Sequence, residues 1–332
     1  MLPRVPGALL LRMCCFAGVG EVHVHGTTIF ARLTAPGTQV LAYQMAYSAK
    51  APTAMILPLP VALPANDSSV RFKSLKEYPD FFRALAHGFP SPPPRLSWPT
   101  KHAEVAAAAT LEVQEVGDFV ASFVPGVADF KRIDRRFVLA PEVWKKLPAY
   151  ADYGFAVFQL KELNGSPHPI ALEFDSRLRE QLFFPTVHIH DGSVHEKDTF
   201  DHVLYAQASA FDARVDDYDG PNSVDRHTGF VRSQSKVANF TDVAQSQGLL
   251  AAELLVHKMS LNGLLPNQDT LFDVSAAAVG KALSASRQQR DNAGACGRCA
   301  ASPRPSGLPL PVGLTLAGLG WSLWRRSQRG SR

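Results

Sequence analysis

The chain has 332 residues, of which 46% are hydrophobic, 19% charged and 9% aromatic. This hydrophobic content excludes a wholly disordered protein, and a total of four cysteines excludes a disulfide-dense secreted scaffold. Residues 281–332 contain nine basic residues and one acidic residue, a charge of +8, whereas residues 1–280 carry 25 basic and 29 acidic groups, a charge of −4. Since this body has no stripe of Lys and Arg interleaved with aromatic residues, the sequence predicts no nucleic-acid partner.

The first 20 residues are expected to act as a weak signal or leader. Arg4 precedes an apolar stretch that Arg12 ends after about seven residues, the lower limit for the apolar region of a signal peptide. If Met13 is the true start instead, its removal leaves Cys14 at the N-terminus. The free α-amino group could then take the thiol proton, as in N-terminal-nucleophile hydrolases. The competing interpretation makes Cys14 and Cys15 small buried residues or one half of a disulfide.

Residues 21–280 are predicted to form an α+β domain, mainly antiparallel β-sheet with a few short helices. Apolar residues alternate over 21–33 and 39–47, which predicts two strands joined as a hairpin by Pro36-Gly37. Further strands are predicted over residues 54–61, 111–124, 153–160 and 170–174, the last two joined through Asn164-Gly165.

Two short helices are predicted within this domain. The first covers residues 74–87, where Ser74 and Glu77 have the spacing of a capping box. The second covers residues 141–150 and begins with a proline, the residue best tolerated in the first helical turn.

Three segments of the domain are harder to place. Residues 90–99 form a Pro-rich connector, which suggests a sub-boundary near 90–105. Residues 212–239 are polar and receive no assignment, and residues 249–264 fit either a helix or a long strand. The chain has no regular βαβ alternation, no Gly-rich phosphate-binding motif and no G-x-S-x-G. Nucleotide-binding and α/β-hydrolase folds are therefore unsupported.

Three histidines make the strongest candidate site. Asp191-Gly192 has the preferred composition of a two-residue type I′ turn, which predicts a hairpin that pairs His188 with His195. His188, His190 and His195 would then share one face, roughly 5–7 Å apart, close enough to bind one divalent metal ion. Zinc is the first choice, because it accepts imidazole and carboxylate ligands. On the opposite face, the hairpin would direct three apolar side chains to the core: Val187, Ile189 and Val194.

Other residues bear on this hypothesis. Asp198, Asp201 or His202 could complete the metal shell or orient a ligand. His23 and His25 alternate in the same way on the first strand and would form a second cluster if that strand lies beside the hairpin. Two other interpretations remain open: a solvent-exposed hairpin face without metal, and a pH-sensitive histidine surface.

The C-terminal segment predicts one membrane span. Residues 307–324 carry no charge, and a helix of that length is roughly 27 Å long, close to the thickness of a hydrocarbon core. Trp321 and Trp324 occupy the position of an interfacial aromatic belt, and four arginines follow in residues 325–332. The positive-inside rule places that basic tail in the cytoplasm and the preceding domain on the extracytoplasmic side of the cell membrane. The alternative, a buried helix of the globular domain, would not end in an arginine cluster.

Residues 281–306, which precede this span, are predicted to be a flexible tether. The tether contains Cys296-Gly-Arg-Cys299, which could form a small disulfide loop. This spacing alone is weak evidence for zinc, since two further ligands are needed.

The chain also resembles a family of uncharacterised exported bacterial proteins. The resemblance lies in Cys14-Cys15-Phe16, Ile29-Phe30-Ala31 and Leu57-Pro58-Leu59-Pro60, together with the C-terminal order of cysteine, apolar helix and arginine cluster. Members of that family have an N-terminal Cys/Phe motif, a Leu-Pro-Val-Pro-like motif and a C-terminal sorting tail. Because the family has no assigned activity, the resemblance implies export and no particular chemistry.

Two classes of function follow from the sequence. The first is a membrane-anchored extracytoplasmic domain that serves as a binding or structural module. The second is an enzyme, either a metal-dependent hydrolase that uses His188, His190 and His195, or a thiol hydrolase with Cys14 as its nucleophile. The sequence does not decide whether the protein is an enzyme, and it indicates no cofactor other than zinc.

Overall fold

The computed structural model describes residues 15–18, 22–89, 114–116, 119–139, 141–189, 193–215, 217–218 and 223–275. The chain divides into two compact units, Met1–Ser286 and Arg287–Arg332, and every described residue belongs to the first unit. In the described part of the chain no helix is both long and apolar enough to cross a membrane. The predicted membrane span at 307–324 lies outside the described residues, as do the tether and the basic tail.

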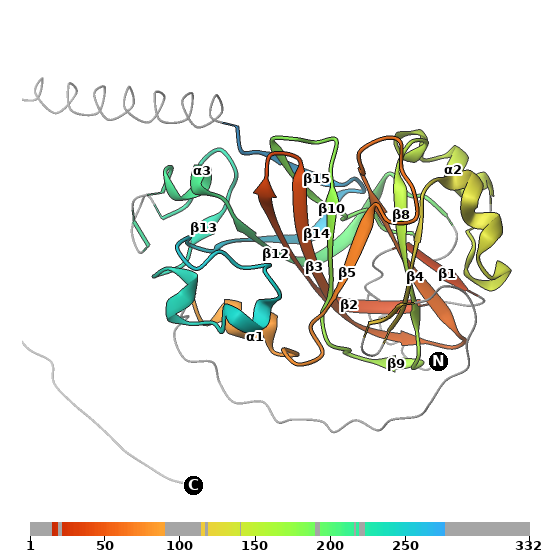
Figure 1. Cartoon of the computed structure of the whole chain (residues 1–332), viewed down its shortest axis with the longest axis horizontal. Helices are drawn as coiled ribbons and strands as arrows, with labels where there is room; N and C mark the ends of the chain where they lie inside the picture. The colour runs from red at the N-terminus through yellow and green to blue at the C-terminus, as the bar shows by residue number, and fades with distance from the viewer. Residues whose placement is uncertain are drawn as a thin grey trace, which may run out of the picture. The chain divides into compact units, whose positions relative to one another are not determined.

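Antiparallel sheet dominates the first unit, as the sequence predicts (Figure 1). One sheet contains β1 (Cys15–Gly18), β4 (Thr53–Leu59), β6 (Gln114–Val116), β7 (Phe119–Val124) and β8 (Gly154–Leu160). These strands lie in the order β1-β4-β8-β7-β6, and each neighbouring pair is antiparallel.

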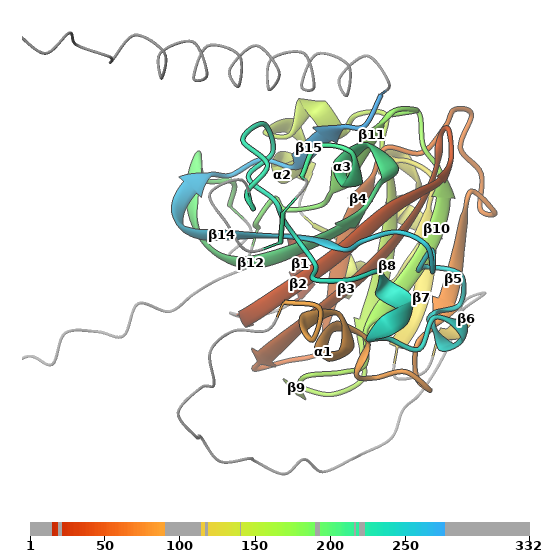
Figure 2. The same cartoon turned by 90° about the vertical axis from the view of Figure 1, so that its left-hand side faces the viewer.

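A second sheet has eight strands. They are β2 (Val22–Ala35), β3 (Thr38–Ala49), β5 (Val70–Ser74), β9 (Asn164–Gly165), β10 (Ile170–Asp175), β12 (Lys197–Gln207), β13 (Val231–Arg232) and β14 (His257–Pro266). Their order is β13-β14-β12-β2-β3-β10-β5, with β9 paired to β3. The β2–β12 pair is parallel, which makes this a mixed sheet; Figure 2 shows β12 and β14 side by side. β11 (Gln181–Phe184) and β15 (Thr270–Asp273) form a separate two-stranded sheet.

Apolar side chains fill three layers around these sheets. One core lies between the two large sheets, and each sheet has a further core on its outer face. Successive residues of a strand alternate between faces, so Met55 of β4 enters the central core while Ile56 enters the outer one. All seven residues of β4 are buried, because both faces of its sheet are covered. This explains why the sequence shows a continuous apolar run there.

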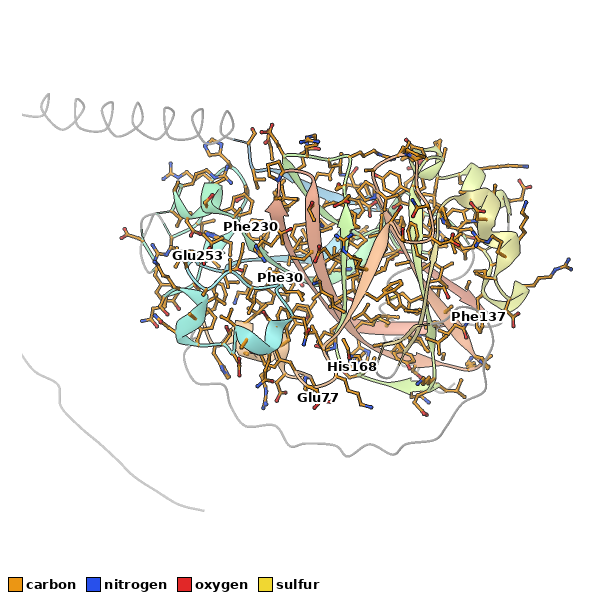
Figure 3. The ribbon with its side chains drawn as sticks, in the orientation of Figure 1. Phe30, Glu77, Phe137, His168, Phe230 and Glu253 are labelled. Carbon is orange, nitrogen blue, oxygen red and sulfur yellow. The ribbon has the colours of Figure 1, made fainter. Side chains whose placement is uncertain are left out.

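Short helices cover the outer faces. On the five-stranded sheet these are η1 (Val127–Arg132), η2 (Arg135–Phe137), α2 (Pro141–Lys145) and η3 (Pro148–Tyr150). On the eight-stranded sheet α1 (Phe81–Ala86), η4 (Val237–Asn239) and η5 (Ala244–Ser246) serve this purpose, whereas α3 (Ser209–Asp212) follows β12. Figure 3 labels Phe137 and Phe30, which belong to the two outer cores.

Several sequence predictions are confirmed. β2 and β3 form the predicted hairpin, in which Gly37 adopts φ +84° at the turn. β4, β8 and β10 match the strands predicted over 54–61, 153–160 and 170–174. The strand predicted over 111–124 is two strands, β6 and β7, which pair with each other. The segment 249–264, left open between helix and strand, becomes a strand only from His257 onward.

The helix predicted over residues 74–87 forms only over Phe81–Ala86, and its predicted start with a capping box at Ser74 is wrong. Ser74 ends strand β5, and its hydroxyl accepts a hydrogen bond from the Lys76 amide instead of capping a helix. α1 begins only at Phe81, after Asp80. Pro79 gives the physical reason, since a proline disfavours helical backbone at the residue before it and thereby delays the start of the helix.

Candidate functional site

His188 is one of a stacked pair of buried histidines. Its ring lies against His202 of β12 with ring centroids 5.0 Å apart, and both side chains are fully buried. The two Nε2 atoms are 3.5 Å apart, so one neutral ring can donate a hydrogen bond to the other. Phe200 stacks on His188, with centroids 4.2 Å apart, and Asp198 Oδ2 lies 3.9 Å from His188 Nδ1. The sequence considered His202 and Asp198 only as accessory groups, yet they are the polar side chains that lie beside His188.

The predicted histidine hairpin does not form in the described residues. No strand extends over 185–188 or 193–196, and β12 pairs with β14 and β2 rather than with the preceding segment. His188 is buried while His195 is exposed, so these two histidines do not share one solvent face. In a hairpin, the backbone groups of His188 and His195 would bond to each other. Here the Nδ2 group of Asn267 donates to the carbonyl oxygens of both residues instead.

The metal hypothesis remains a prediction, since His190 lies outside the described residues. Within the described ranges, no group of three or more His, Cys, Asp or Glu side chains could hold a metal ion. If the hypothesis holds, purified protein contains about one zinc per chain by elemental analysis, and His190→Ala lowers that content sharply. Zinc content unchanged in His190→Ala and in His195→Ala would contradict it.

The first-strand histidines do lie in a strand adjacent to β12. β2 pairs in parallel with β12, and the Gly26 amide donates to Asp201 Oδ2 at 2.8 Å. His25 is exposed, whereas the Nδ1 atom of His23 and the Oδ1 atom of Asp201 are buried without a hydrogen-bond partner in the described structure. Cys14, which the thiol-hydrolase hypothesis requires, lies outside the described residues.

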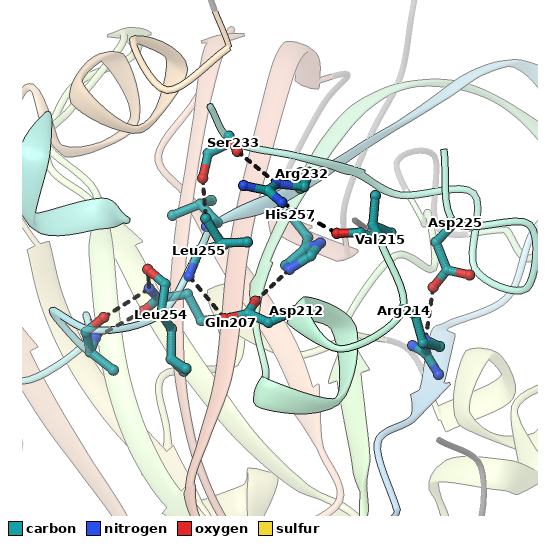
Figure 4. Close-up of polar contacts among 12 residues, drawn as sticks. Gln207, Asp212, Arg214, Val215, Asp225, Arg232, Ser233, Leu254, Leu255 and His257 are labelled. Atoms are coloured by element: carbon teal, nitrogen blue, oxygen red, sulfur yellow. Dashed lines mark hydrogen bonds and ion pairs between the residues drawn. The ribbon is translucent and has the colours of Figure 1, made fainter. Parts of the chain in front are cut away.

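A His–Asp pair that the sequence did not indicate joins β14 to the end of α3 (Figure 4). His257 Nε2 is 2.7 Å from Asp212 Oδ1, and the Leu255 amide donates to the other carboxylate oxygen. The His257 side chain is fully buried. The hydroxyl of nearby Ser233 donates to the Ser235 carbonyl and accepts from the Val256 amide. We interpret this network as a structural clamp on the segment before β14, because the imidazole is enclosed and the hydroxyl is already engaged.

The outer face of the five-stranded sheet contains an open groove of about 980 Å³. It arises because this part of the chain folds as short turns: Gly126 is extended before η1, and prolines begin both α2 and η3. Such turns bury their aromatic side chains on β8 and leave space between the backbone segments. The apolar part of the groove is lined by Val127, Ala128, Phe130, Val138, Leu139, Trp144 and Ala151.

Aromatic stacking fixes one wall of this groove. Phe130 and Trp144 stack with ring centroids 5.1 Å apart, and Trp144 packs on Phe155 of β8 at 4.7 Å. Trp144 is 8% exposed, and its indole N–H is buried without a hydrogen-bond partner in the described structure. A buried donor that lacks an acceptor is uncommon in folded proteins.

Three cations line the same groove: Lys131, Arg135 and Lys145. Lys145 forms an exposed ion pair with Glu142 at 2.9 Å. Within the described structure, Lys131 and Arg135 form no ion pair. We call the groove lined by these three cations and the Phe130–Trp144 wall the basic groove.

Behind the basic groove, a carboxylate anchors η3. The Tyr150 hydroxyl donates to Asp269 Oδ2 at 2.6 Å, and the Thr186 and Val187 amides donate to Oδ1. Burial raises the pKa of Asp269 to about 6, although these three hydrogen bonds act in the opposite direction. Ala151, which lines the basic groove, directly follows Tyr150, so this contact helps to hold the groove wall in place.

A second groove, of about 630 Å³, lies between β5 and β7. Its charged residues are already paired with acidic groups. Arg132 contacts both carboxylate oxygens of Asp67, and Arg71 contacts Glu173 at 2.7 Å. This groove therefore offers fewer free charges to a ligand than the basic groove does.

Comparisons with known proteins give a loose likeness in fold. No family model and no curated protein matches the chain. Among solved structures, the baculovirus P35 crystal structure matches with a TM-score of 0.42 and 15% identity over 79% of this chain and 99% of that one. P35 in the caspase-8/P35 complex matches with a TM-score of 0.36 and 13% identity over 77% of this chain and 96% of that one. At these values the likeness carries no argument about activity or partners.

Proposed function

We propose that this protein is a membrane-anchored extracytoplasmic binding module and that the basic groove is its ligand site. The observation that carries the proposal is the groove itself, an open space of about 980 Å³ lined by aromatic and aliphatic side chains with a few charged groups. Small-molecule sites in proteins have this size and composition. The proposal therefore rests on a surface suited to binding and needs no catalytic group.

The arrangement of the polar clusters supports binding over hydrolysis. Acid–base catalysis needs a group within hydrogen-bond reach of a substrate. The His257 imidazole is fully buried, and its Nε2 lies 2.7 Å from Asp212, whose carboxylate also accepts from the Leu255 amide. His188 is fully buried against Phe200 and His202. The basic groove, in contrast, is open and has a wall held by stacked rings.

The proposed membrane anchor is the uncharged segment 307–324, which is predicted from the sequence together with the arginines that follow it. In bacterial cells, we expect the full chain to stay with membranes washed at alkaline pH, and a chain ending at Ser306 to move to the soluble fraction. Protease added to intact spheroplasts should digest the domain of the full chain, because the positive-inside rule places it outside. Full-length protein in the soluble fraction would contradict the anchor, and protection from protease would contradict the orientation.

A further inference from the structure

We infer that the ligand of the basic groove is an amphiphilic anion, a small molecule with an apolar body and one negative group such as a carboxylate or phosphate. This inference rests on the proposed function, because it names the ligand class of the same groove. Three features of the groove support it: two cations without an ion pair in the described structure, an apolar lining, and the indole N–H of Trp144.

The cations of the basic groove favour a ligand with a negative charge. Lys131 and Arg135 line the groove within one stretch of η1 and η2, and neither forms an ion pair in the described structure. Two acidic side chains nearby are paired with other cations: Asp129 lies 3.7 Å from Arg132, and Glu142 lies 2.9 Å from Lys145, the third cation of the groove. A ligand with one negative group would therefore meet two uncompensated cations, and Arg can bind a carboxylate or phosphate with two parallel hydrogen bonds.

The apolar lining of the basic groove favours a ligand that also has an apolar part. The accessible apolar lining comes from partly buried or exposed side chains: Val127, Ala128, Val138 and Ala151. Phe130 and Trp144 are buried at the base of this lining, and the contacts of Trp144 with Phe130 and Phe155 hold its ring in place. Covering this lining removes apolar surface from water, which stabilises the complex by roughly 25 cal/mol for each Å² buried. A free inorganic anion would leave the apolar surface of Val127, Ala128 and Val138 uncovered, so the complementary ligand carries both an apolar body and a negative group.

The indole N–H of Trp144 is a polar donor on a residue that lines the groove. It is buried, and no acceptor contacts it in the described structure. A ligand oxygen, or a water bound with it, would reach this donor once the Trp144 ring shifts, because the N–H has almost no exposed surface in the described structure. In the groove between β5 and β7, by comparison, Arg71 and Arg132 already contact acidic side chains.

The test compares two probes of nearly the same size and shape, the anion 1-naphthaleneacetate and the neutral 1-naphthaleneacetamide. Binding is measured by isothermal titration calorimetry on the full chain in nanodiscs of phosphatidylcholine. We expect the anion to bind about tenfold more tightly than the amide, as one charge-assisted contact would provide. Lys131→Gln/Arg135→Gln should remove that difference by weakening the anion alone. Ala128→Phe, which fills the groove from an exposed position, should weaken both probes.

Lys76→Gln/Lys236→Gln is the matched control, because it removes two exposed cations that do not line the groove. It should leave binding of both probes unchanged, and a loss there would overturn the inference in favour of net charge. Equal binding of anion and amide would overturn the inference while leaving the groove as a ligand site. If neither naphthalene probe nor dodecanoate binds, the proposed function itself fails. Binding of phosphatidylserine vesicles without binding of the free anions would overturn the inference and indicate a membrane-contact surface.

Discussion

Replacement of Asp225 by Asn is expected to lower the free energy of unfolding by about 3–5 kcal/mol. Arg214 Nε lies 2.9 Å from Asp225 Oδ2, and the two side chains are only 5% and 2% exposed (Figure 4). Asn retains an oxygen to accept from the His227 amide, so the turn after residue 225 keeps that contact. Asn lacks the negative charge and the second acceptor oxygen, which also accepts from the Thr228 hydroxyl. The Arg214 guanidinium then stays buried without the one counterion that it has in the described residues. Urea denaturation followed by circular dichroism measures the change.

The matched control is Asp152→Asn, the same substitution in an ion pair that is exposed to solvent. Arg177 contacts Asp152 at 2.8 Å, with side chains 27% and 56% exposed. Solvent screens this pair, so the expected loss is about 1 kcal/mol or less. The double variant Arg214→Met/Asp225→Asn should recover part of the stability that Asp225→Asn loses, because it removes the buried charge. Equal losses in Asp225→Asn and Asp152→Asn would show that the Arg214–Asp225 pair is accessible to water.

Local patterns predict much of the β structure. Alternating apolar residues around Pro36-Gly37 predict the β2–β3 hairpin, and the unbroken apolar run after residue 53 predicts a strand buried on both faces. Both features are determined by residues that lie close together in the sequence, so a local pattern is enough to predict them. The parallel pairing of β2 with β12 joins segments about 175 positions apart, and no local pattern encodes such a contact.

The candidate sites depend even more on contacts between distant segments, which local patterns do not encode. Asp191-Gly192 has the composition of a tight turn, but tertiary contacts decide whether a hairpin forms, and Asn267 binds the carbonyls of both flanking segments. His188 is therefore buried against Phe200 rather than displayed beside His195. Burial on both sides of the segment overrides the alternation that the sequence suggested.

The basic groove was not predicted from the sequence. It is built from 3₁₀ turns, which have no hydrophobic periodicity of their own. The available signal was the mixture of Phe130 and Trp144 with Lys131, Arg135 and Lys145 over a short stretch. Such a mixture is also typical of an ordinary surface helix, and only the fold shows that these side chains line one space.

Between about pH 4 and pH 6, the titration of Asp269 is expected to lower the stability of the protein as pH rises. Burial raises its pKa from 3.8 to about 6 in the folded protein. In this window the folded state holds a proton on Asp269 that the unfolded state has released, and stability falls with pH wherever the folded state binds more protons. The contribution of this titration to the free energy of unfolding is largest below pH 4 and is lost above pH 6. It amounts to at most about 3 kcal/mol.

Asp269→Asn tests this expectation, because Asn is neutral at every pH and retains an oxygen for the Thr186 and Val187 amides. Thermal melting of both proteins from pH 4 to pH 7 should show the variant gaining stability relative to the unmodified protein as pH rises, most steeply between pH 4 and pH 6. Tyr150→Phe should extend that window to higher pH, since the Tyr150 hydroxyl donates to the carboxylate and lowers the pKa of Asp269. A stability difference between Asp269→Asn and the unmodified protein that stays constant from pH 4 to pH 7 would contradict a raised pKa. The Tyr150 hydroxyl donates more strongly to the charged carboxylate than to the protonated acid, so protonation of Asp269 would loosen this contact with η3. Ala151 at the edge of the basic groove directly follows Tyr150, so the same pH series links the titration of Asp269 to the shape of the proposed ligand site.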